Sequence, residues 1–128
     1  MKKTKGAGGS MDLSISQMMA LQKKLFEPHK DEWHPMEPEY GKDFILYMIE
    51  EIGEVISIIK KKGSGAVAED PAVREAFLSE MADVLMYYHD ILLRYNVTPE
   101  EISAAYLKKH GHDMRRNYKA EYEEKYNG

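Results

Sequence analysis

Apolar residues recur along this chain with the three- and four-residue spacing of amphipathic helices. Four segments carry the pattern: residues 14–26, 40–62, 71–95 and a last one that begins at 98. At about 100° per residue, the main stripe of the second segment consists of Ile45, Met48, Ile49, Ile52, Val55, Ile56 and Ile59. No segment of useful length alternates as a strand would. The pattern predicts an all-α fold with a four-helix, bundle-like arrangement.

Helix start and stop signals define the ends of these segments. In chain order they are Pro28, Pro35 and Pro38 after the first helix, Gly63 after the second, Asp70-Pro71 before the third and Thr98-Pro99 before the fourth. Proline cannot continue a helix, whereas Asp and Thr accept hydrogen bonds from its first turn. Residues 64–69 are expected to form a loop, and a bend is expected at Gly111 in the last helix.

Two acid-x-x-acid pairs lie in the second and third predicted helices. They are Glu51 with Glu54, and Glu80 with Asp83. Residues three apart project from one side of a helix, so two facing helices would bring four carboxylates together. Glu51 and Glu80 fall inside apolar sectors of their helices, where an uncompensated charge costs several kcal/mol. These positions therefore require a cation, a buried base or a shifted pKa.

The ligand chemistry of these acids favours a hard divalent cation. Carboxylate oxygens with water suit Mg²⁺, with Mn²⁺ as the alternative ion. A di-iron bundle would usually need Glu-x-x-His on two helices, and none of the five histidines has a Glu three residues before it. The sequence predicts a magnesium site made of Glu51, Glu54, Glu80 and Asp83.

Composition narrows the class of protein. A chain of 128 residues with 43% hydrophobic residues can bury one core, so residues 11–128 are expected to form a single domain. Residues 1–10 are expected to be a flexible tail or an added extension. The absence of cysteine excludes disulfides and thiolate sites and fits a cytoplasmic protein. A net charge of −4 disfavours nucleic acid as a partner, and no apolar run approaches the roughly 20 residues of a membrane span.

The acidic motifs carry a family resemblance. The motifs are Glu50-Glu51-Ile52-Gly53-Glu54 and Glu80-x-x-Asp83-Val84-Leu85-Met86-Tyr87. They resemble the all-α nucleoside triphosphate pyrophosphohydrolases, the MazG-like and dimeric dUTPase-type superfamily, over residues 40–118. The resemblance implies a MazG-like fold in which both pairs bind Mg²⁺. It also implies hydrolysis of a (d)NTP to a nucleoside monophosphate and pyrophosphate, for house-cleaning or control of the nucleotide pool.

The same resemblance implies residues for substrate binding. Relatives carry a Lys-x-x-x-Asn-x-x-Arg segment that contacts phosphates; Lys108 and Arg115 match it, and His112 stands at the Asn position. These side chains, joined by Lys119 if the helix continues through Gly111, would share one basic face. Relatives also place aromatic residues from the region of Trp33 and His34 against the base. The alternative for Trp33 is a structural one, as a cap over the core.

Two further expectations concern mechanism and assembly. Glu51, flanked by apolar residues, is expected to orient or deprotonate the attacking water, because burial near other carboxylates raises a pKa. A stripe of Tyr118, Tyr122 and Tyr126 is expected to pack or to form a subunit interface, and a homodimer or homotetramer is predicted. The alternative function is a non-catalytic helical interaction module with a structural divalent ion.

Overall fold

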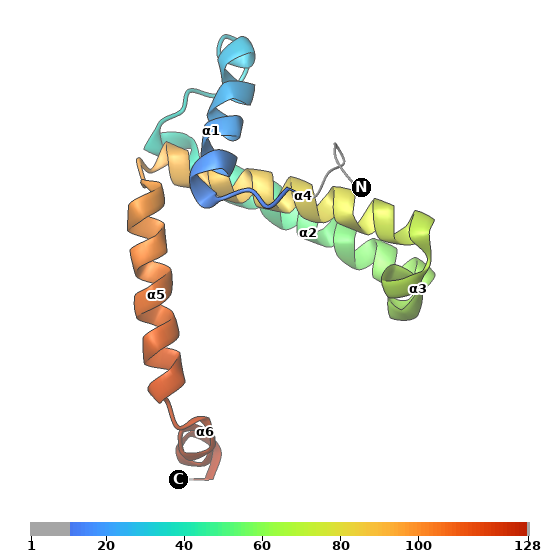
Figure 1. Ribbon diagram of the computed structural model, residues 1–128, viewed down its shortest axis with the longest axis vertical. Helices are drawn as coiled ribbons and strands as arrows, with labels where there is room; N and C mark the ends of the chain where they lie inside the picture. The colour runs from blue at the N-terminus through green and yellow to red at the C-terminus, as the bar shows by residue number, and fades with distance from the viewer. Residues whose placement is uncertain (1–10, 128) are drawn as a thin grey trace. The chain divides into compact units, whose positions relative to one another are not determined.

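The computed structural model describes residues 11–127, and within them all regular secondary structure is helical (Figure 1). The α-helices are α1 (Ile15–Phe26), α2 (Gly41–Lys62), α3 (Ser64–Glu69), α4 (Pro71–Arg94), α5 (Pro99–Arg115) and α6 (Tyr118–Asn127), with 3₁₀ turns at Glu27–His29 and Pro38–Tyr40. The prediction of an all-α fold is confirmed. The expectation of a tail at 1–10 lies outside the described residues. The chain divides into two units, the first ending at Val97 and the second beginning at Thr98.

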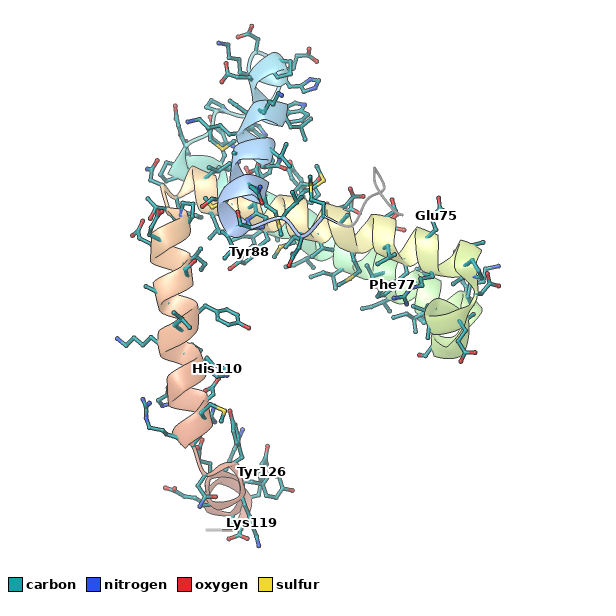
Figure 2. The ribbon with its side chains drawn as sticks, in the orientation of Figure 1. Glu75, Phe77, Tyr88, His110, Lys119 and Tyr126 are labelled. Carbon is teal, nitrogen blue, oxygen red and sulfur yellow. The ribbon has the colours of Figure 1, made fainter. Side chains whose placement is uncertain are left out.

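The first unit is organised around α2 and α4, which run antiparallel side by side (Figure 1). Val55 of α2 and Leu92 of α4 are buried, and α1 packs on α4 with Met19 buried. Side chains of α4 project from different sides of the helix. Figure 2 shows Glu75 projecting outward and Phe77 on the side toward α2. Of the apolar stripe predicted for α2, Val55 is buried in this packing, whereas Ile45, Ile49, Ile52 and Ile56 stay exposed.

A close contact and a buried histidine characterise the C-terminal part of α4. Gly41, the first residue of α2, is buried, and the ring of Tyr95 occupies the space that a β-carbon at this position would need. Glycine thus allows the start of α2 to approach the end of α4. His89 is 4% exposed, and burial lowers the pKa of its ring, so it packs as a neutral side chain.

The turn between α2 and α4 differs from the expectation. Residues 64–69 form the short helix α3, so the prediction of a loop there was wrong. Gly63 ends α2 at a φ of +88°, a backbone conformation that glycine adopts without strain. Val67 is then buried, and its packing stabilises a helix that Ser and Gly alone would not favour. Asp70 begins α4 as predicted, with its carboxylate accepting from the amides of Ala72 and Val73.

The second unit begins with a capping box at Thr98, one of the predicted helix starts. The amide of Glu101 donates to Thr98 Oγ1 at 3.1 Å, and the amide of Thr98 donates to Glu101 Oε1 at 2.9 Å. Contrary to expectation, α5 runs without interruption through Gly111 and ends at Arg115.

The break lies at residues 116–117 instead. Arg116 is extended, with ψ of 147°, and the Asn117 side chain accepts from the amide of Ala120 at the start of α6. Arg116 also donates through Nε and Nη2 to the Glu121 carboxylate, a paired geometry that fixes the corner. Lys119 therefore lies on α6 and does not extend a single helical face that includes Lys108.

Across residues 11–127, each helix is too short or too polar to cross a bilayer.

Candidate metal centre

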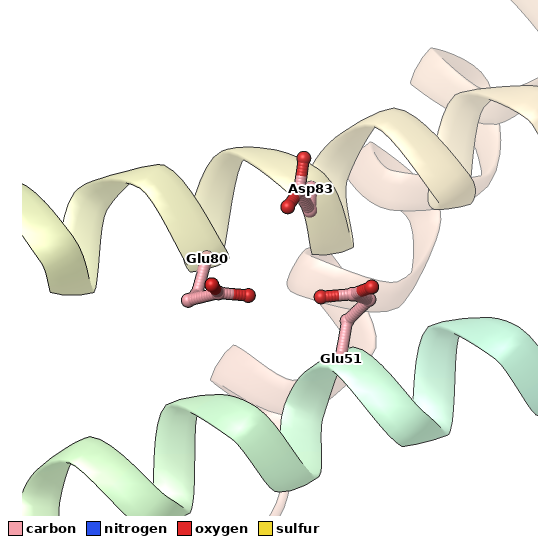
Figure 3. A group of neighbouring side chains, drawn as sticks. All are labelled: Glu51, Glu80 and Asp83. Carbon is pink, nitrogen blue, oxygen red and sulfur yellow. The ribbon is translucent and has the colours of Figure 1, made fainter.

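Three carboxylates meet between α2 and α4 (Figure 3). Glu51 reaches from α2 toward Glu80 and Asp83 of α4, and one oxygen from each group lies within 4.8 Å of the others. All three residues are partly buried. The structure therefore brings together three of the four carboxylates that the sequence nominated.

Helix packing explains why these groups meet. Glu51 stands one turn before Val55, which is buried, so its side chain emerges at the edge of the α2–α4 contact. Glu80 and Asp83 are three residues apart and project from the same side of α4. Axes of packed helices lie about 8–10 Å apart, a gap that carboxylate side chains from both helices can span.

The electrostatics of the cluster disfavour three separate negative charges. The pKa of Glu51 is raised above its ordinary value, first by a side-chain hydrogen bond with Glu80 and then by burial. The charges of Asp83, Glu80 and Glu54 raise it further. In the absence of a cation, Glu51 thus holds a proton more readily than an isolated glutamate would. A divalent cation could replace that proton and relieve the repulsion.

Glu54, the fourth predicted ligand, is exposed and lies outside the group of three. Its charge nevertheless contributes to raising the pKa of Glu51, which places it in the same electrostatic neighbourhood. The three-residue spacing of the α2 pair brings Glu54 to the margin of the cluster. Its carboxylate oxygens do not join the 4.8 Å group.

A pocket of about 510 Å³ adjoins the acids within the first unit. Glu51 and Asp83 form part of its lining, and so do Trp33 and His34, the two residues that the sequence nominated for contact with a base. A volume of this size is typical of small-molecule sites, about 300–1,000 Å³. The pocket therefore joins the acidic cluster and the predicted aromatic residues in one cavity.

Aromatic rings make up much of the pocket wall. The lining includes Trp33, Phe44, Tyr47 and Tyr87. Phe44 packs against Tyr47 with ring centroids 5.2 Å apart, and Trp33 stacks on His29 at 4.4 Å. Trp33 is 37% exposed, so part of its ring is open to a ligand. Such a wall suits a flat organic group that is stacked or held edge-on.

The pocket also contains polar residues that sequence reasoning did not assign to it. Gln22 of α1 is 8% exposed and lines the cavity, and its amide offers both a donor and an acceptor. Asp90 of α4 is 1% exposed and pairs with Arg94. A sequence signal existed for each, namely Gln22 within an apolar helical stripe and Asp90 four residues before Arg94.

The predicted phosphate contacts lie in the second unit. Lys108, His112 and Arg115 are all on α5 and all exposed. His112 Nδ1 lies 3.4 Å from Asp113 Oδ1, and this contact is the largest cause of the lowered pKa of Asp113. The basic face of α5 is thus partly neutralised along one edge by a carboxylate.

Comparison of the chain with family models, curated proteins and solved structures found no match. The resemblance to the MazG-like enzymes accordingly stays a prediction that rests on the acidic motifs.

The raised pKa of Glu51 leads to a prediction for Glu51→Gln. Because the folded-state pKa of Glu51 is raised, the folded protein loses stability relative to the unfolded chain as pH rises above the ordinary glutamate range, about 4.3. Glutamine removes the charge and can still donate to Glu80. In EDTA at pH 7 the variant should therefore unfold at a higher urea concentration than wild type, and the gain should shrink near pH 4.

The control for this measurement is Glu50→Gln, which removes a charge from the exposed neighbour on α2. It should leave the urea midpoint within error of wild type at both pH values. Equal midpoints for wild type and Glu51→Gln at pH 7 would show that the three carboxylates do not repel one another in the metal-free protein.

Proposed function

We propose that this protein is a Mg²⁺-dependent nucleoside triphosphate pyrophosphohydrolase of the MazG-like type. It would convert a (d)NTP and water into a nucleoside monophosphate and pyrophosphate, in house-cleaning or control of the nucleotide pool in the cytoplasm. The observation that carries the proposal is that the acidic cluster and the aromatic pocket form one continuous site. Glu51 and Asp83 belong both to the acidic cluster and to the lining of an aromatic pocket.

This continuity matches the two halves of a nucleotide. The carboxylates of Glu51, Glu80 and Asp83 would hold Mg²⁺, or Mn²⁺ as the alternative ion, and Glu54, which lies outside the group of three, would add a further carboxylate at the margin. When bound, the ion supplies positive charge for phosphate oxygens and lowers the pKa of a bound water. An acidic protein, with a net charge of −4, needs such compensation to bind a polyanion.

The chain's own residues account for the remaining chemistry. Glu51, whose pKa is raised, would orient the attacking water and accept its proton. The water oxygen forms a bond to phosphorus as the bond between the α- and β-phosphates breaks, and pyrophosphate leaves. Trp33 and His34 would contact the base, with the amide of Gln22 available for hydrogen bonds to its edge.

The basic face of α5 fits binding of phosphate groups. Arg115 can donate paired hydrogen bonds to a phosphate, and Lys108 and His112 add positive charge on the same helix. These residues are proposed as phosphate contacts on the basis of the motif that they resemble.

Exposed apolar stripes on α2 and α4 support self-association. The stripe residues are Ile45, Ile49, Ile52 and Ile56 of α2 together with Leu78, Met81 and Leu85 of α4. At about 100° per residue, both stripes lie on the side of the α2–α4 pair that faces away from Glu51 and Asp83. A second copy of the chain presents the same stripes, so a two-fold contact would cover both at once. We therefore propose a homodimer, with a homotetramer as its further assembly.

The second candidate function is a non-catalytic helical interaction module with a structural divalent ion. The cluster of Glu51, Glu80 and Asp83 is compatible with it, because a carboxylate site of this kind can stabilise two helices without catalysing a reaction. The adjoining aromatic pocket favours the enzyme, since a purely structural ion does not need one.

Hydrolysis of nucleotides tests the proposal directly. With Mg²⁺ and a panel of (d)NTPs, the protein should release nucleoside monophosphate and pyrophosphate in equal amounts, measured by ion-exchange chromatography. Asp83→Asn should reduce kcat/KM by about 100-fold or more, since even residues that only support metal ligands contribute about 10- to 100-fold. Glu50→Gln serves as the control and should be unaffected. If Mg²⁺ binds but no (d)NTP is cleaved, the structural module is the better account.

The variant Ile52→Glu tests the proposed self-association. An acid in the middle of the α2 stripe would place two like charges near the two-fold axis of the proposed dimer. Multi-angle light scattering should show a dimer or tetramer for wild type and a monomer for the variant. Leu21→Glu, which alters an exposed leucine on α1, should keep the wild-type mass. A monomeric wild type at micromolar concentration would contradict the proposed interface.

A further inference from the structure

An ion pair at the end of α4 is buried more completely than any acid of the acidic cluster. Arg94 is 0% exposed and Asp90, one turn earlier, is 1% exposed. Arg94 Nε donates to Asp90 Oδ1 at 2.5 Å. Removing two charges from water is expensive, so a pair of this kind is a weak source of stability by itself. The other contacts of Arg94 indicate the role of this ion pair.

Those contacts reach the loop between the two 3₁₀ turns. Arg94 Nη1 donates to the backbone carbonyl oxygen of His34 at 3.1 Å and to that of Pro35 at 2.5 Å. Within residues 11–127, Arg94 is the source of every side-chain hydrogen bond that joins residues 30–37 to a distant helix. The loop that contains Trp33 and His34 is thus tied to α4 by one guanidinium group.

The same guanidinium also lies against the pocket wall. Its central carbon is 3.5 Å from the centre of the Phe44 ring, a cation–π contact. Phe44 lines the pocket, and the His34 ring meets it edge-on at 6.4 Å and stacks on Tyr40 at 4.7 Å. Arg94 therefore contacts both the backbone of His34 and the ring of Phe44, although it does not itself line the cavity.

We propose that Arg94, oriented by Asp90, is a positioning residue that fixes the loop of Trp33 and His34 as a wall of the pocket. It thereby sets the affinity for the organic part of the ligand, and it does not alter the acidic cluster. The inference about affinity rests on the proposed function, whereas the inference about the loop does not. A planar guanidinium can donate to Asp90 and to two carbonyls while stacking on Phe44, and a lysine ammonium cannot reproduce this set of contacts.

Two variants separate positioning from folding. Arg94→Lys keeps the charge and loses the planar geometry. In the double variant Asp90→Leu/Arg94→Met, both charges are removed together, so no unpaired charge stays buried and the helical fold should persist. Arg74→Met is the matched control, because it removes an exposed arginine from the same helix. Far-UV circular dichroism checks the helical content of each protein.

The loop can be observed without any ligand. Trp33 is the single tryptophan of the chain, and the residue is 37% exposed. If Arg94 holds the loop, quenching of Trp33 fluorescence by acrylamide should increase in both Arg94 variants, with emission shifted to longer wavelength. Affinity for Mg²⁺ alone, measured by calorimetry, should stay at the wild-type value. KM for the best (d)NTP should rise about tenfold or more with a smaller change in kcat, as expected when ground-state binding is lost.

Each result decides a separate part of the inference. Wild-type quenching in both Arg94 variants would overturn the proposal, because the loop would then be held by other contacts. Increased quenching with an unchanged KM would overturn the link between the loop and affinity. If wild-type protein hydrolyses no (d)NTP, the proposed function fails, and the quenching measurement still decides whether Arg94 positions the loop.

Discussion

The antiparallel packing of α2 against α4 places three carboxylates within 4.8 Å of one another, and much of the first unit is arranged around that contact. Burial of apolar side chains such as Val55 and Leu92 makes the packing favourable, while Glu51 at the edge of the contact makes it electrostatically costly. The raised pKa of Glu51 is the local sign of this conflict. A divalent cation would resolve it, and the same ion would give the acidic site an attraction for phosphate. Stability of the helical pair and the proposed chemistry therefore depend on the same three side chains.

The two sides of the α2–α4 pair have different properties. One side bears the acids and the aromatic pocket, and the other bears exposed apolar stripes that include Ile52 and Leu85. A pair of long helices can serve both purposes because side chains about 100° apart along a helix face different surroundings. Assembly through the apolar side would leave the pocket accessible while shielding the exposed isoleucines from water. Asp90, which is buried with Arg94 near the end of α4, also lines the pocket.

Local periodicity was sufficient to predict the long helices and the meeting of acids across them. Glu51, Glu80 and Asp83 could be nominated because each pair projects from one side of its helix. Tertiary packing decided what the pattern could not. Helix α3 exists because Val67 is buried, and no periodicity is measurable in six residues. The contact between Arg94 and the His34 carbonyl spans 60 residues of sequence, so no local motif could reveal it.

We propose that the acidic cluster and the pocket act together on one metal-bound nucleotide. Calorimetry can measure binding of a non-hydrolysable α,β-methylene (d)NTP in the presence of Mg²⁺ and in the presence of EDTA. This comparison tests the proposal without requiring turnover. Wild type should bind the analogue at least about tenfold more tightly with Mg²⁺, a coupling of roughly 1.4 kcal/mol, and Asp83→Asn should lose that gain. Equal affinity for the analogue with Mg²⁺ and with EDTA would contradict the joint action of cluster and pocket. So would an Asp83→Asn variant that keeps the full increase in affinity with Mg²⁺.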